Sequence, residues 1–231
     1  MKTVGIIGGI GPESTIQYYR RILDAWRERV TDGSQPSLII NSINMKRLLD
    51  AFAAGELDQV TTYLASEVAR LADAGAEFGL LAANTPHVVF GEIQACVKLP
   101  LISIVEVTAA AARERGCRRV GLIGTRFTMD GRFYPDAFVR HGMTIVAPDQ
   151  AERAWIHEKY LGELVPGVFL PETRARLIEI IGAMKTRDRI DAVILGGTEL
   201  PLILDDETAS PVPYLDTTAI HVAAVISRLL D

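Results

Sequence analysis

The sequence predicts an α/β protein of two pseudo-symmetric lobes, each with a parallel sheet, and a ligand cleft between the lobes. Two observations support this prediction. Short runs of Val, Ile and Leu that end in Gly or Asn alternate with longer amphipathic stretches, which is typical of βα units with a buried parallel sheet. The second half of the chain also repeats motifs of the first half at a nearly constant spacing.

Eight apolar runs are expected to form strands, and amphipathic stretches between them are expected to form helices. In the stretch from Glu56 to Ala74, for example, the apolar side chains recur at helical spacing on one face. The expected strands are Thr3–Ile7, Ser37–Ser42, Phe78–Ala82, Leu101–Ile104, Arg119–Ile123, Thr144–Val146, Ala192–Leu195 and Val212–Leu215.

The internal repeat predicts a first lobe over residues 1–115, with the C-terminal helix packing on it, and a second lobe over residues 116–231. Any two βα units resemble each other to some degree, but three ordered matches at offsets of about 111 to 116 residues favour a duplication. The matches are VGIIGG at 4–9 with VGLIGT at 120–125, AGAEFGLLAANTPH at 74–87 with RIDAVILGGTELP at 189–201, and PLISIVEVTAA from Pro100 with PVPYLDTTAI from Pro211.

Composition and charge exclude several classes of partner. The net charge of −5 is spread along the chain without a basic block, which argues against nucleic acid or an anionic membrane as partner. No run of eighteen apolar residues predicts a membrane span, and the start MKTVGIIGG lacks the long apolar region of a signal peptide, so a cytoplasmic location is expected. Two cysteines fit a reducing compartment, and neither has metal-ligand spacing, so no metal site is expected.

Several nucleotide and hydrolase motifs are missing. The segment GGIGPES matches a dinucleotide-binding fingerprint only loosely, and the chain has neither a phosphate-binding P-loop nor a GxSxG turn. The four histidines are dispersed. His87, directly after a predicted strand, is interpreted as a structural hydrogen-bonding residue rather than as a base.

Four segments are expected beyond the carboxyl ends of strands, where ligands bind in open α/β sheets. Each offers glycines, hydroxyls or amides before a helix, which suits a small anion because backbone N–H groups direct positive partial charge toward it. These segments are GGIGPEST at 8–15, AANTPH at 82–87, GTRFTM at 124–129 and GGTEL at 196–200.

Together, these four motifs resemble those of the aspartate/glutamate racemase family, in its broad-specificity amino-acid racemase branch. The resembling motifs are G-G-x-G-P-E-S-T, A-N-T-x-H, G-T-R-x-T-M and G-x-T-E, and the match extends in order from Lys2 to Asp216–His221. The resemblance implies a racemase-like fold and an isomerase that inverts the α-carbon of an acidic amino acid without pyridoxal phosphate or another cofactor. It also implies a small amino acid or dicarboxylate as ligand and a homodimer.

The expected catalytic pair is replaced in this chain. By the resemblance, the usual catalytic residues are two cysteines, in C-N-T-x-H and G-C-T-E, one for each face of the substrate, and threonine replaces the first in some members. The corresponding residues are Ala83 and Gly197, which can neither take nor give a proton, so two-thiol racemisation is predicted to be lost. Glu199 is a candidate substitute base, whereas the family pattern favours contact of this residue with the substrate amine or support of the loop. Cys96 and Cys117 lie away from the predicted strand ends and are interpreted as small buried apolar residues.

The rest of the pocket matches the family pattern. Arg47 is expected to pair with a distal carboxylate, the alternative being a solvated loop arginine; Glu13 and Asp216 are weaker candidate site residues. By the resemblance, the residues expected to bind substrate are Gly8, Gly9, Arg47, Asn84, Thr85, Thr125, Thr128 and Thr198.

Three hypotheses about function follow. The first is a racemase-family protein that acts on or binds a small acidic amino acid and has lost two-thiol racemisation. The second is a different carbanion-type enzyme on the same scaffold, such as a lyase, decarboxylase or isomerase, with Glu199, His87 or a hydroxyl as proton carrier. The third is a non-catalytic ligand-binding protein.

Overall fold

The computed structural model describes residues 2–231 and divides the chain into two compact units. Unit 1 consists of Met1–Ile104 and His221–Asp231, and unit 2 of Val105–Ile220. The expected boundary after residue 115 differs from this division by the length of one helix, α5 (Ile104–Glu114), nearly all of which belongs to unit 2.

Unit 1 is built on a four-stranded parallel sheet. Its strands are β1 (Thr3–Gly8), β2 (Ser37–Ser42), β3 (Phe78–Leu81) and β4 (Leu101–Ile102), in the spatial order β2-β1-β3-β4. All four residues of β3 are buried, as expected for a central parallel strand that is covered on both faces.

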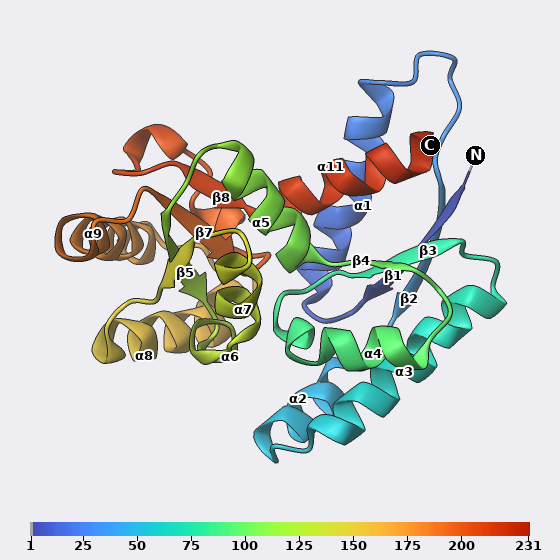
Figure 1. Ribbon diagram of the computed structural model, residues 1–231, viewed down its shortest axis with the longest axis horizontal. Helices are drawn as coiled ribbons and strands as arrows, with labels where there is room; N and C mark the ends of the chain where they lie inside the picture. The colour runs from blue at the N-terminus through green and yellow to red at the C-terminus, as the bar shows by residue number, and fades with distance from the viewer. Residues whose placement is uncertain (1) are drawn as a thin grey trace. The chain divides into compact units, whose positions relative to one another are not determined.

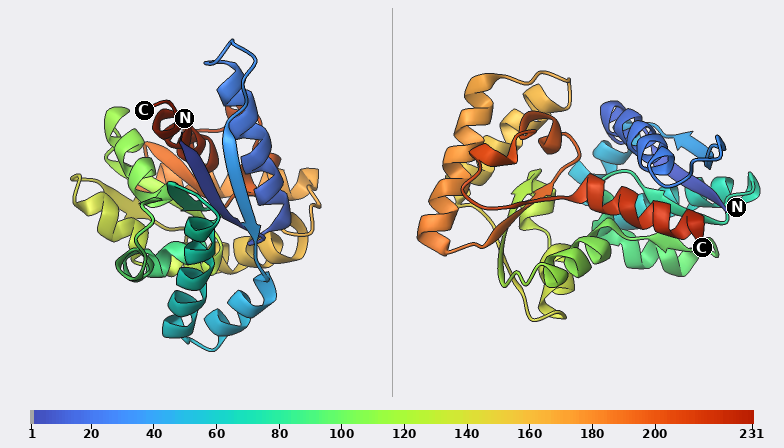
Figure 2. Two further views of the ribbon diagram at one scale, coloured as in Figure 1. Left: turned by 90° about the vertical axis from the view of Figure 1, so that its right-hand side faces the viewer. Right: turned by 90° about the horizontal axis from the view of Figure 1, so that it is seen from above.

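Helices cover both faces of this sheet (Figure 1). On one face, α1 (Pro12–Arg27) and the unit 1 part of α11 (Thr217–Leu230) pack on β1 and β3 through an apolar cluster that includes Ile22, Phe78 and Val225. The start of β1 and the end of α11 lie near each other (Figure 2). The remaining helices of unit 1 are α2 (Met45–Ala53), α3 (Leu57–Asp73), the short 3-10 helix η1 (Thr85–Val89) and α4 (Phe90–Cys96).

Unit 2 repeats the same sheet. Its strands are β5 (Arg119–Gly124), β6 (Thr144–Val146), β7 (Ala192–Gly196) and β8 (Tyr214–Asp216), all parallel in the order β6-β5-β7-β8. In both units the first strand therefore lies between the second and the third. This shared order confirms the predicted α/β fold with two parallel sheets, and it is the arrangement that a duplication would leave.

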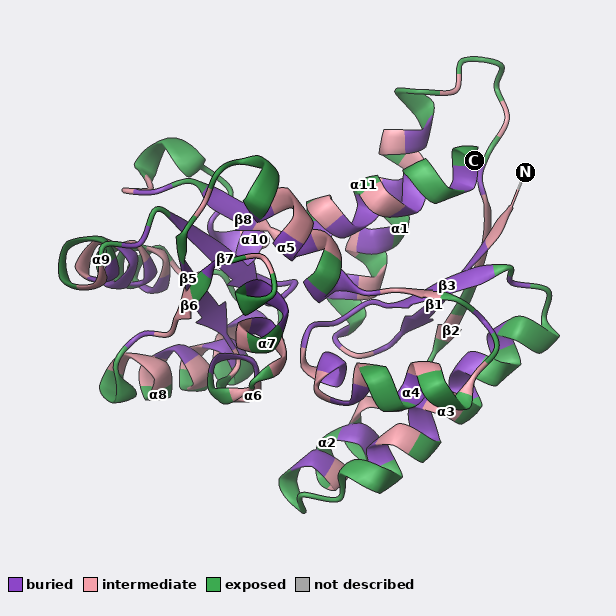
Figure 3. Ribbon diagram, viewed as in Figure 1, coloured by how far each residue is buried: buried purple, intermediate pink, exposed green. Residues whose placement is uncertain are grey.

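The helices of unit 2 also lie on both sides of their sheet (Figure 1). On one side are α8 (Gln150–Lys159) and α9 (Pro171–Asp188), and on the other are α5 and α7 (Phe133–Val139). The sheet is buried, while the outward faces of the helices are exposed (Figure 3). Besides α5, the helices are α6 (Arg126–Asp130), α7 (Phe133–Val139), α8 (Gln150–Lys159), the π-helix η2 (Tyr160–Leu164), α9 (Pro171–Asp188), α10 (Leu200–Ile203) and the 3-10 helix η3 (Glu207–Ala209).

All eight predicted strands are present, and in two of them an end differs from the expected range by more than one residue. The fourth is shorter than expected because α5 already begins at Ile104. The eighth begins at Tyr214 instead of Val212, directly after Pro213, which has no N–H group for the ladder. The Pro213 carbonyl still accepts a hydrogen bond from the Val193 N–H group, at 3.0 Å.

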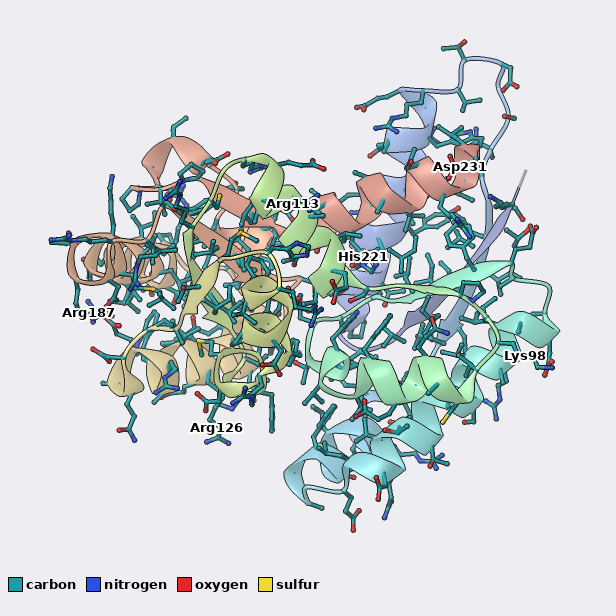
Figure 4. All side chains as sticks on the ribbon, in the orientation of Figure 1. Lys98, Arg113, Arg126, Arg187, His221 and Asp231 are labelled. Atoms are coloured by element: carbon teal, nitrogen blue, oxygen red, sulfur yellow. The ribbon has the colours of Figure 1, made fainter. Side chains whose placement is uncertain are left out.

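A buried histidine fastens α11 to unit 1. His221 (labelled in Figure 4) accepts a hydrogen bond from the Tyr18 hydroxyl at Nδ1, over 2.8 Å, and donates one from Nε2 to the Ile102 carbonyl, over 3.0 Å. Burial lowers the pKa of His221 to about 4, so the ring is neutral at neutral pH. A neutral ring with one donor and one acceptor satisfies both partners at once.

Candidate functional site

The carboxyl ends of β1 and β3 form the predicted ligand-binding edge of unit 1. Because β1 and β3 are adjacent and parallel, the loops that follow them lie side by side. The start of α1 is tied to both strands: the Ser14 hydroxyl donates to the Ala82 carbonyl at 2.8 Å, and the Gly9 N–H group donates to the Thr15 hydroxyl at 2.8 Å.

Gly8 and Gly9 are required by the packing of the chain itself. Gly9 has a φ of 77°, and a Cβ there would lie 2.5 Å from the Ile43 carbonyl oxygen. At Gly8 a Cβ would lie 2.5 Å from the Thr15 Cγ2 atom. These contacts explain both glycines without a ligand, and their role in substrate binding stays a prediction.

The loop after β3 carries Ala83, Asn84 and Thr85. Ala83 and Asn84 are buried and Thr85 is half-buried. The side chain of Ala83 is a methyl group, so the loop presents no proton donor or acceptor at this position. Its carbonyl oxygen, in contrast, is a partner of the nearby His87.

His87 has a structural role in this loop. Its Nδ1 atom donates to the Ala83 carbonyl at 3.0 Å, its Nε2 atom accepts from the Ile104 N–H group at 3.2 Å, and its ring stacks on Phe90 at 4.9 Å between centroids. Burial first, and the nearby His221 second, lower its pKa to about 3. With both nitrogens engaged by backbone groups, His87 is the structural hydrogen-bonding residue that the sequence indicated.

Arg47 lies on α2, exposed to solvent, with its guanidinium carbon 4.2 Å from the centre of the Tyr63 ring. This cation–π contact accounts for the orientation of the side chain. The Tyr63 hydroxyl in turn accepts from the Asn44 N–H group at 3.2 Å, just before α2 begins. Pairing of Arg47 with a distal carboxylate stays a prediction.

In unit 2, Thr125 and Thr128 lie at the carboxyl end of β5. Thr125 is the N-cap of α6, where its hydroxyl accepts from the Thr128 N–H group at 3.3 Å. The two hydroxyl oxygens are 3.2 Å apart, and Thr128 is fully buried. The two hydroxyls therefore contact each other, and their contact with a carboxylate stays a prediction.

Gly197, directly after β7, lies against the aromatic ring of Tyr160. A Cβ built on Gly197 would meet the Tyr160 hydroxyl oxygen and Cε2 atom, and would lie only 2.6 Å from Cζ. Real Cβ atoms do not approach other heavy atoms this closely. Tyr160 therefore occupies the space that any side chain at position 197 would need.

Tyr160 is held there by Glu199. The Tyr160 hydroxyl donates a short hydrogen bond to the Glu199 carboxylate, and the Thr198 hydroxyl donates to the same oxygen at 3.1 Å. Tyr160 is 4% exposed and Glu199 3% exposed. Burial first, and the negative charge of Glu199 second, raise the pKa of Tyr160 well above 10, so the phenol is protonated at neutral pH.

Sequence reasoning named Glu199 and Thr198 but missed Tyr160. Tyr160 is the first residue of η2, after α8, and is separated from Glu199 by 39 residues in the chain. It belongs to no recognisable motif, and only the three-dimensional contact with Gly197 reveals it.

The two cysteines lie away from these loops. Cys96 ends α4, before β4, and Cys117 precedes β5, so both are on the amino-terminal side of a strand. The interpretation of both as buried residues was wrong for Cys96, which is exposed, and Cys117 is half-buried. The helix face on which a cysteine falls decides its exposure, whatever its apolar character. Burial, and then the charge of Asp191, raise the pKa of Cys117.

Glu13 and Asp216, the two weaker candidates, lie at helix starts. Glu13 is exposed in the first turn of α1, and Asp216 accepts from the Ala219 N–H group at 3.0 Å at the start of α11. Throughout residues 2–231, we found no group of three His, Cys, Asp or Glu side chains that could hold a metal ion. In the same part of the chain, no helix has the length and apolarity needed to cross a membrane.

We predict that Gly197→Ala destabilises the protein by about 1–3 kcal/mol, the usual cost of overpacking a core. The Tyr160 ring can move aside only by breaking its hydrogen bond to Glu199 and losing contacts with its apolar cluster. The control is Gly162→Ala in η2, where a Cβ meets no atom within 4 Å, and which is expected to be neutral or slightly stabilising. Urea denaturation measures both. Equal stability of the Gly197→Ala variant and the unmutated protein would show that the space is free.

We also predict acid destabilisation from the buried histidines. The pKa of His87 falls from 6.5 to about 3 on folding, so its stabilising contribution is complete above pH 6.5 and is lost as the pH falls from 6.5 towards 3. Near pH 5 this corresponds to about 1.4 kcal/mol per pH unit. His87→Gln should reduce the slope of unfolding free energy against pH by that amount. An unchanged slope in His87→Gln would refute the assignment.

The chain is similar to known racemases in sequence and structure. A solved aspartate racemase homologue from Pyrococcus horikoshii is 34% identical, with a TM-score of 0.86 and full coverage of both chains. A solved protein from Yersinia pestis assigned to the Asp/Glu racemases is 31% identical, with a TM-score of 0.91 and full coverage of both chains. The broad-specificity amino-acid racemase RacX of Bacillus subtilis is 22% identical over 98% of each chain.

A more distant likeness extends to a glutamate racemase from Francisella tularensis, solved in complex with D-glutamate. It is 15% identical, with a TM-score of 0.71 over 99% of this chain and 81% of the other, and supports the fold alone. The model of the Asp/Glu/Hydantoin racemase family matches residues 7–225. Because that match covers nearly the whole chain, this protein belongs to the Asp/Glu/Hydantoin racemase family.

Proposed function

We propose that this protein binds a small amino acid or dicarboxylate without a cofactor, and that it does not invert the ligand by the two-thiol mechanism. Membership of the family supports the ligand class. The absence of thiols at the predicted catalytic positions supports the loss of inversion, because Ala83 and Gly197 carry a methyl group and a hydrogen atom.

Inversion at an α-carbon requires an acceptor on one face and a donor on the other. The one observation that carries the proposal is the contact between Gly197 and Tyr160. A thiol at residue 197 is not merely missing from the sequence, because the volume its side chain would need is filled by a buried phenol. The packing of unit 2 therefore favours glycine at residue 197.

The proposed ligand contacts come from polar groups near the strand ends of each unit. In unit 1 they are Gly8, Gly9, Asn84 and Thr85, with Arg47 as partner of a distal carboxylate. In unit 2 they are Thr125, Thr128 and Thr198. A cytoplasmic location and a homodimer belong to the same proposal and rest on the sequence and on the family resemblance.

A second candidate function is different carbanion chemistry on the same scaffold. The hydrogen-bonded pair of Tyr160 and Glu199 beside Gly197 favours it over a purely binding role, because this pair can exchange a proton. His87 is not suited to that task, since backbone groups engage both of its nitrogens.

The proposal is tested by measuring thermal stability and inversion with a panel of D- and L-amino acids, including aspartate and glutamate, and simple dicarboxylates. At least one ligand should raise the melting temperature by several degrees, since a ligand at 100 times its Kd adds about 2.7 kcal/mol to the native state. Chiral chromatography should detect no inversion of that ligand. Efficient inversion by the unmutated chain would refute the proposal.

Thr198→Val provides the matched test of the binding residues. Loss of this buried hydroxyl should reduce the thermal shift, whereas Thr144→Val, on the exposed side of β6, should leave it unchanged. If no ligand of the panel shifts the melting temperature, the proposed ligand class is wrong.

A further inference from the structure

Tyr160 and Glu199 form a buried hydrogen-bonded pair beside Gly197, the residue that takes the place of the cysteine in a G-C-T-E motif. The phenol of Tyr160 overlaps the position of a Cβ at residue 197, so its hydroxyl lies where a thiol on that residue would begin. The Glu199 carboxylate accepts a hydrogen bond from the Tyr160 hydroxyl, and the Thr198 hydroxyl donates to the same carboxylate oxygen. Three groups of different chemistry thus converge directly after β7.

We propose that Tyr160, with Glu199 as its proton acceptor, is a catalytic acid/base of this protein and exchanges the α-proton of a bound amino acid on one face. The inference rests on the proposed function, because it takes the same small amino acid as substrate. It assigns the catalytic role to a residue that no motif marks.

The local structure suits Tyr160 to this role. Tyr160 begins a π-helix, in which the Val165 N–H group donates to the Tyr160 carbonyl at 2.9 Å, and such helices often occur at functional sites. The π-helix is anchored through Glu163, whose carboxylate accepts from Lys159 and from the Thr173 hydroxyl. The ring is therefore held in a defined position.

The burial of the pair determines its chemistry. A protonated phenol and a carboxylate in a region of low dielectric interact strongly, and removing either partner takes away the hydrogen bond between them. Since burial and the charge of Glu199 raise the pKa of Tyr160, no free phenolate is available at neutral pH. The pair must accept a proton together.

The proposed step is balanced within the pair. The α-C–H bond of the substrate breaks, and its proton forms a new O–H bond on the phenol oxygen as the original phenol proton moves to the Glu199 carboxylate. The electron pair of the broken bond stays on the substrate and is delocalised into its carboxylate. While the carbanion persists, the phenol proton and the Glu199 proton both exchange with solvent. The reverse step then delivers a solvent hydrogen from the phenol to the same face, and the Glu199 proton returns to the phenol oxygen.

This chemistry is one-sided. Ala83 offers no second donor, so the proton returns to the face that it left and the configuration is retained. The substrate should therefore acquire deuterium from D₂O at the α-carbon with retention of configuration.

The experiment uses the ligand that gives the largest thermal shift, incubated with protein in D₂O and followed by the NMR signal of its α-proton. The unmutated protein should catalyse exchange with retention, as checked by chiral chromatography with mass spectrometry. Tyr160→Phe keeps the ring and removes the hydroxyl, and it should slow exchange by at least 100-fold, the usual scale for loss of a general acid or base. Glu199→Gln should have a similar effect, and both variants should keep the ligand-induced thermal shift.

Tyr214→Phe is the matched control, because Tyr214 is a buried tyrosine of the same apolar cluster, and it should exchange at the unmutated rate. A ligand that shifts the melting temperature without any exchange overturns the inference and leaves the proposed function standing. Exchange that is unaffected by Tyr160→Phe also overturns it. A panel without any thermal shift contradicts the proposed function itself. If Tyr160→Phe fails to fold, the exchange rate of Glu199→Gln tests the inference. An unmutated exchange rate in that variant overturns it.

Discussion

The arrangement of side chains after β7 depends on one packing contact, between Gly197 and the phenol ring of Tyr160. A side chain at residue 197 and the ring of Tyr160 cannot occupy the same space. The hydrogen bond from Tyr160 to Glu199 holds the ring in that place. A phenol from η2 therefore fills the space that the second side chain of a G-C-T-E motif would take. A cysteine introduced at this position alone would therefore have to displace the phenol ring.

The duplicated fold explains why the two loops after β3 and β7 can be compared at all. Both units have the same order of parallel strands, so Ala83 and Gly197 follow equivalent central strands. The loops differ in what fills the space near these residues. In unit 1 the nearby His87 is engaged by backbone groups, whereas in unit 2 a buried phenol donates a hydrogen bond to a buried carboxylate. The symmetry of the backbone is thus not matched by symmetry of the chemistry.

The strands were predictable because buried parallel strands are continuous apolar runs that end in glycine or asparagine, and all eight are present. The four strand-end motifs and the family could also be read from the sequence, since their residues are local in the chain. Tyr160 could not, because its contact with residues 197 and 199 joins segments that are far apart in sequence. Nor does a residue pattern distinguish the π-helix at Tyr160 from a continuation of α8. The exposure of Cys96 was missed because the rotation of a short helix decides it.

The most direct test of the central claim is a crystal structure of the Gly197→Cys variant. The account predicts that the Tyr160 ring is displaced and that its hydrogen bond to Glu199 is broken, because the new Cβ would otherwise overlap the ring. A structure in which the cysteine side chain is ordered while Tyr160 still donates to Glu199, with the backbone unchanged, would contradict the claim.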